Sequence, residues 1–183
     1  MIGPEADPDM RPDNLYNWGA DMARSLADAA RTHFNMSFDM LENMIDKCPD
    51  SLWDKKRGGF IFWQQILHAL TGVNFWMRLA NDRFTEPFIG KVLYPELDGE
   101  PEDSLTKEEL KAYAREVRSL CDAFFDKKND AWFAEKSVLY DKITNMDIVL
   151  MLMRHIQYHT GHCDSILRED GFEAVEWLDY FGD

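Results

Sequence analysis

Hydrophobic residues recur at helical spacing over four stretches of the chain. From Leu15 to about Lys47 one glycine and no proline interrupt apolar positions that return every three or four residues. This pattern predicts one long helix, or two shorter ones broken near Thr32. An aromatic-rich stretch from about Phe60 to Arg83 predicts the second main helix. No alternating pattern typical of a strand persists beyond a few residues.

Two capping-box patterns predict where two further helices begin. Thr106-Lys-Glu-Glu109 opens a third helix, which we expect to run to about Lys127. Thr144-Asn-Met-Asp147 is a weaker version, because aspartate replaces the usual glutamate or glutamine, and it opens a last helix that ends near Glu169. Four principal helices with short to moderate connections predict an all-α fold, a four-helix bundle.

The remaining segments suggest one domain with a lead and a long loop. Residues 1–14 are acidic and contain several prolines, which predicts a flexible N-terminal lead, and residues 15–183 are long enough for a single domain with its own core. Residues 84–105 hold three prolines, two glycines and a cluster of acids, which predicts a long loop. We expect the acidic, aromatic C-terminal tail to pack back on the body.

Composition and charge narrow the class of protein. Hydrophobic residues make up 45% of the chain, as in a folded globular protein, and the formal net charge of −14 argues against nucleic acid and anionic membrane surfaces as partners. No segment approaches the roughly 20 apolar residues of a membrane span. The N-terminus lacks the apolar stretch of a secretory signal, and the three cysteines form no CxxC pair. We therefore expect a cytoplasmic protein without disulfides.

Three of the five histidines lie within eight residues of the last predicted helix. At about 100° per residue, His159 lies about 40° from His155 and His162 about 20° to its other side, so all three project from one narrow strip. Two histidines at i and i+4 can bind one divalent ion. His68, in the second predicted helix, is the obvious source of a third ligand, because bundle cores build metal sites from facing helices.

Other interpretations of these histidines remain open. They could be core residues satisfied by internal hydrogen bonds in a purely structural bundle without metal. If they bind an ion, three neutral imidazoles leave at least one coordination position open, as in catalytic sites. That position could activate water or ionise a thiol substrate, and the affinity order of divalent metals does not separate zinc or nickel from copper or iron.

The other candidates have less defined roles. His162 could be a fourth ligand, a residue that lines the pocket or a proton shuttle, with a surface position as the main rival; we take it as the candidate catalytic residue. His33 is most simply an ordinary, partly exposed histidine. Phe75, about 20° from His68 on the helical wheel, is the best aromatic candidate for lining a cavity.

These motifs resemble the DinB/YfiT-like superfamily. Its last-helix signature, His-xxx-His followed closely by glycine, is similar to His155-Ile-Gln-Tyr-His159-Thr-Gly161-His162, where His162 replaces a common glutamine. Its helix-two signature, a histidine in an apolar aromatic run, is similar to Phe62–Trp76 around His68. The resemblance implies an up-down-down-up bundle, here with an N-terminal extension, and a zinc or nickel ion held by His68, His155 and His159.

The resemblance leaves the activity open. Proteins of this superfamily include thiol-dependent S-transferases, a maleylpyruvate isomerase and proteins described only as metal-dependent hydrolases. We expect a metal-binding protein that acts as a metal-dependent hydrolase or thiol S-transferase on a small molecule, in a homodimer. The alternative is a non-catalytic stress or ligand-binding protein that has kept the metal site.

Overall fold

The structure is a computed structural model that describes residues 24–81 and 83–179. Four long helices make up most of the fold. They are α1 (Leu26–Lys47), α3 (Phe62–Trp76), α4 (Lys107–Phe125) and α6 (Asn145–Glu169). Two short helices, α2 (Asp50–Trp53) and α5 (Asp130–Ala134), and a small hairpin of β1 (Lys56–Arg57) and β2 (Phe60–Ile61) lie in the connections. The prediction of a mainly helical fold is confirmed.

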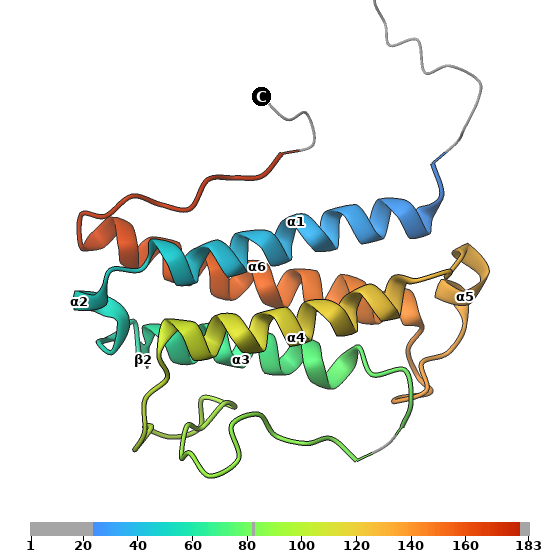
Figure 1. Cartoon of the computed structure of the whole chain (residues 1–183). Coiled ribbons are helices and arrows are strands. Elements are labelled where there is room, and N and C mark those ends of the chain that lie inside the picture. Colours follow the sequence, from blue (N-terminus) through green and yellow to red (C-terminus); the bar gives the residue numbers. More distant parts are fainter. Residues whose placement is uncertain (1–23, 82, 180–183) are drawn as a thin grey trace, which may run out of the picture.

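The long helices lie side by side and differ in direction. Helices α1 and α6 run one way along the molecule, and α3 and α4 run the other way (Figure 1). Helix α6 contacts both α1 and α3, and α4 also contacts both. In the part of the chain that the structure describes, no helix is both long enough and apolar enough to cross a membrane.

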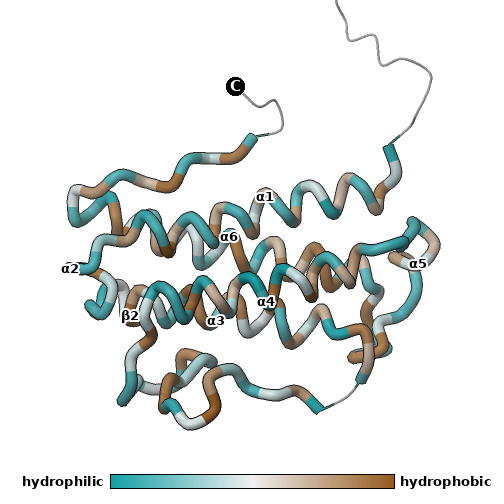
Figure 2. The backbone as a smooth tube through the Cα atoms, viewed as in Figure 1, coloured by the Kyte–Doolittle hydropathy of each residue, from teal (hydrophilic) through white to brown (hydrophobic). Residues whose placement is uncertain are grey.

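The core forms where the apolar stripes of the helices meet. Phe34, Phe38 and Leu41 of α1 are completely buried, and so are Ile66 and Ile156 of α3 and α6. Figure 2 shows hydrophobic and hydrophilic residues interleaved along the helices, as expected when one face of each helix is buried. This core fixes the faces that α3 and α6 turn toward each other.

Three helix starts follow from capping residues. The capping boxes at Thr106 and Thr144 both form, and the Asp147 side chain accepts a hydrogen bond from the Thr144 backbone N–H at 2.8 Å. Ser25 caps α1. Helix α1 therefore begins at Leu26 rather than Leu15, and it is continuous through Thr32. The predicted flexible lead and residues 15–23 lie outside the described residues.

The second predicted helix was too long at both ends. Phe60 belongs to the hairpin, and α3 ends at Trp76 rather than Arg83. After α3 the chain folds back, so that the Phe84 ring packs on the Phe75 ring with 5.3 Å between centroids. The Arg78 guanidinium stacks over both rings. These aromatic contacts favour a return of the chain over further helix.

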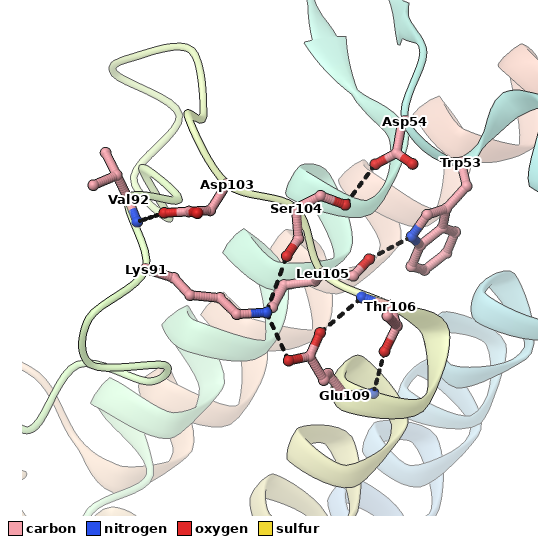
Figure 3. A network of polar contacts seen from close by, with 9 residues as sticks. All are labelled: Trp53, Asp54, Lys91, Val92, Asp103, Ser104, Leu105, Thr106 and Glu109. Carbon is pink, nitrogen blue, oxygen red and sulfur yellow. Dashed lines mark hydrogen bonds and ion pairs between the residues drawn. The ribbon is translucent and has the colours of Figure 1, made fainter.

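The segment between α3 and α4 is the predicted long loop, and tertiary hydrogen bonds hold it in place. The Gln64 side chain donates to the carbonyl oxygens of Tyr94 at 3.0 Å and Gly99 at 3.1 Å. Lys91 binds the Ser104 carbonyl oxygen and the Glu109 carboxylate of α4 (Figure 3). The loop is therefore fixed against α3 at one point and against α4 at another.

The C-terminal segment packs back on the body, as predicted, through Val175 and Leu178. Val175 is buried, and its backbone N–H donates to the Asp164 carboxylate at 2.9 Å. Glu173 pairs with Lys47 at the end of α1. Residues 180–183 lie outside the described part of the chain.

Candidate metal centre

Three histidines from two helices meet in the core. His68 lies on α3, and His155 and His159 lie one turn apart on α6. The His68 ring centroid is 4.8 Å from each of the other two, which are 4.9 Å from each other. One candidate ligand nitrogen from each histidine lies within 4.8 Å of the others. The structure thus brings together the three residues predicted as metal ligands.

The separation of these nitrogens is close to what a shared ion requires. Two nitrogens bound tetrahedrally at about 2.0–2.1 Å from an ion lie about 3.4 Å apart. Small rotations of the imidazole rings would close the difference. Among the described residues, no cysteine or carboxylate belongs to the group, so its donors are three imidazoles.

Hydrogen bonds orient two of the three rings. His68 Nδ1 lies 2.8 Å from the carbonyl oxygen of Pro95 in the long loop, and because a carbonyl only accepts, Nδ1 carries the hydrogen. His159 Nδ1 lies 3.4 Å from Gln65 Oε1, one turn before His68 on α3. Both contacts leave Nε2 as the atom with a free lone pair, the form needed by a metal ligand.

The third ring, that of His155, has room because the residue facing it is a glycine. Gly72 faces His155, and a Cβ atom at Gly72 would lie 2.8 Å from Cε1 and 3.0 Å from Nδ1 of that ring. Contacts this short would force the imidazole to move. Glycine at this position of α3 therefore makes room for His155.

Burial keeps two of the imidazoles neutral. Burial, with a smaller contribution from the charge of the adjacent His68, lowers the pKa of His155 to about 4. Burial also lowers the pKa of His159 to about 3, with smaller contributions from His68, His155 and His162. Both rings are thus neutral near pH 7, as metal ligands must be. In donor type and spacing the three residues fit a divalent ion, and two of them are held neutral.

A cavity of about 500 Å³ lies beside the histidines. His68 and His155 form part of its wall, and Phe75, Trp76 and Phe84 provide an aromatic side. The prediction that Phe75 lines a cavity is confirmed. Two glutamates of the long loop, Glu86 and Glu96, also face this space. It is large enough for a small molecule in reach of the histidine cluster.

His162 lies elsewhere on α6. Its ring packs against the hairpin turn, where a Cβ atom at Gly58 would lie 2.1 Å from His162 Nε2. His162 is neither in the three-histidine group nor among the residues that line the cavity. The charge of His162 nevertheless helps to lower the pKa of His159. His33 is exposed on α1, away from the group.

Several residues of the site were not identified from the sequence. Pro95 contributes a backbone carbonyl, and Glu86 and Glu96 reach the cavity only through the path of the loop, so no local motif marks them. Gln65 and Gly72 carried a usable signal. They lie three residues before and four residues after His68, on the same face of the helix.

Comparison with known proteins gives one match. A family model described as the DinB family matches residues 22–182, nearly all of the chain. No curated protein and no solved structure matches.

Proposed function

The chain belongs to the DinB family, and from this premise we propose that His68, His155 and His159 hold one divalent metal ion used for chemistry on a small molecule. The observation that carries the proposal is the meeting of three imidazoles, two of them held neutral, beside a cavity of about 500 Å³. Nε2 of His68 and Nε2 of His159 would be donors. Zinc and nickel are the ions that we expect.

The reaction class that fits best is metal-dependent hydrolysis or thiol S-transfer. A divalent ion with three neutral ligands supplies a strong Lewis acid and an open position for water or a thiol. The protein contributes the orientation of the ligands through Gln65 and the Pro95 carbonyl. The aromatic side chains of the cavity would keep bulk water from a bound substrate.

We retain His162 as the candidate proton-transfer residue, because it is electrostatically coupled to His159. If it acts in this way, His162→Ala should lower turnover by no more than about 10²–10⁴-fold while leaving the metal content intact. Unchanged turnover would assign His162 to packing against the hairpin.

A non-catalytic ligand-binding protein is the second candidate. It is favoured by the position of His162 away from the cavity wall. Kinetics separates the two candidates. A metal-loaded protein that binds a ligand at the ion but turns over no ester, amide or electrophile–thiol pair would favour the second.

Metal analysis tests the proposed site directly. Purified wild type supplemented with zinc or nickel should hold one ion per chain, and His155→Ala and His159→Ala should hold none. His33→Ala is the matched control, because it removes an exposed imidazole from another helix. Full metal content in both site variants would contradict the proposal.

We further propose that the four long helices form the up-down-down-up four-helix bundle of the family and that two copies associate. Leu150 and Tyr158 on α6 are 50% and 71% exposed, and a partner could cover them. A monomer mass in light scattering over a wide concentration range would exclude the homodimer.

The three cysteines are unpaired and buried, which suits a reducing compartment such as the cytoplasm.

A further inference from the structure

The cavity beside the histidines has an unusual distribution of charge. Two of its lining residues, Glu86 and Glu96, are acidic, and none is lysine or arginine. Neither carboxylate has an ion-pair or hydrogen-bond partner among the residues that the structure describes. Both residues are solvent-exposed. This part of the cavity lining is therefore negatively charged.

The two carboxylates influence each other. The pKa of Glu86 is raised, first by partial burial and then by the negative charge of Glu96. Neither glutamate belongs to the group of candidate metal ligands, which among the described residues contains only histidines. A positive charge between the two glutamates would relieve their repulsion.

The aromatic part of the cavity lining also suits a cation. Phe75 packs edge-to-face on Trp76 and on Phe84, with centroids 5.2 Å and 5.3 Å apart, so the three rings form one continuous surface. Aromatic faces attract ammonium groups and bury their apolar substituents. Arg78 stacks on Phe75 and Phe84 but does not line the cavity, and the two carboxylates outweigh its single charge.

We infer that this cavity accepts a small molecule with an ammonium group on an apolar body, and that Glu86 and Glu96 determine this specificity. The inference rests on the proposed function only in treating the cavity as the substrate site of the histidine cluster. The cation would lie between the glutamates and the aromatic wall, and the rest of the molecule would extend toward His68 and His155.

A quaternary ammonium probe tests this without interference from the metal. Benzyltrimethylammonium has no lone pair on nitrogen and cannot coordinate an ion, and benzyl alcohol has the same ring without the charge. Calorimetric titration of the full chain, with zinc and with a chelator, should show the cation binding at least about fivefold more tightly. Added salt should weaken cation binding and leave the alcohol unaffected.

Variants assign the preference to the two residues. The double variant Glu86→Gln and Glu96→Gln should bind the cation about fivefold to tenfold more weakly, without change for the alcohol. Glu102→Gln is the control, because it removes the same charge from an exposed position of the same loop outside the cavity. Equal binding of cation and alcohol, or equal losses in the double variant and the control, would overturn the inference.

The outcomes separate this inference from the proposed function. If the protein holds no metal but binds the cation through Glu86 and Glu96, the metal proposal fails and the cation site stands. If metal binds and the cation shows no preference, the cation site fails alone.

Discussion

His68 donates a hydrogen bond from Nδ1 to the carbonyl oxygen of Pro95 across 2.8 Å, and this contact joins the candidate metal centre to the long loop. Glu96, the next residue along the chain, lines the cavity. The orientation of a candidate ligand and the position of a cavity-wall residue are thus set by the same stretch of loop.

Zinc should stabilise the folded protein. An ion that binds only the folded state adds about 2.7 kcal/mol to the free energy of unfolding when present at 100 times its dissociation constant. Thermal unfolding with excess zinc should therefore occur at a higher temperature than with a chelator. His155→Ala should show the same unfolding temperature in both conditions, and an equal shift in that variant would place the stabilising ion elsewhere.

The metal-free protein should lose stability as the pH falls from about 6.5 toward about 4. Above this range His155 and His159 are neutral in both the folded and the unfolded chain. Below pH 6.5 the unfolded chain binds protons that the folded chain does not bind, because burial lowers the pKa of these residues to about 4 and about 3. The free energy of unfolding should stop falling with pH near these two folded-state pKa values.

Urea unfolding in the presence of a chelator measures this effect. Between pH near 7 and pH near 5 each of the two histidines should reduce the free energy of unfolding by up to about 2 kcal/mol. A variant with both residues changed to glutamine reports the contribution of all other groups. Identical pH slopes in the two proteins would refute the assignment.

Gln65→Leu should weaken metal binding without removing it. The substitution takes away the acceptor of His159 Nδ1, so the ring is no longer fixed with Nε2 toward the ion, and such second-sphere losses cost about 10–100-fold in affinity. Competition with a chelating dye measures the dissociation constant. Gln157→Leu on α6, whose amide contacts Met40, is the control and should leave affinity unchanged.

Gly72→Ala and Gly161→Ala should have opposite effects. The new methyl group at Gly72 would lie 2.8 Å from the His155 ring and displace it, so metal affinity and stability should both fall. Gly161 also lies within a helix, but a Cβ atom there meets nothing within 4 Å. Alanine at that position should stabilise the fold by about 0.5–1 kcal/mol. Unaltered metal affinity in Gly72→Ala would show that His155 can move freely.

Local rules account for most of what the sequence predicted correctly. The capping boxes at Thr106 and Thr144 were recognisable because each is formed by residues three apart, and the structure contains both. The histidine cluster was predictable for a similar reason. His155 and His159 are one turn apart, and His68 lies in the apolar, aromatic-rich stretch predicted as the second main helix.

The failures have a common cause in contacts between distant segments. Helix α3 was predicted to continue to Arg83, but the packing of Phe84 on Phe75 turns the chain back. The loop residues of the cavity depend on hydrogen bonds from Gln64 and on the Lys91–Glu109 pair. No pattern within a window of neighbouring residues encodes these contacts, so Glu86 and Glu96 were missed.

The candidate ligands and the lining of the cavity come from α3, α6 and the loop between α3 and α4, while α1 and α4 provide neither. Apart from their polar caps and the Lys91–Glu109 contact, the buried positions of the latter two helices must satisfy mainly volume and polarity, which many combinations of apolar residues do. Saturation mutagenesis should therefore divide the molecule lengthwise. One half should accept only a few exchanges, and the other should tolerate extensive replacement while metal binding persists.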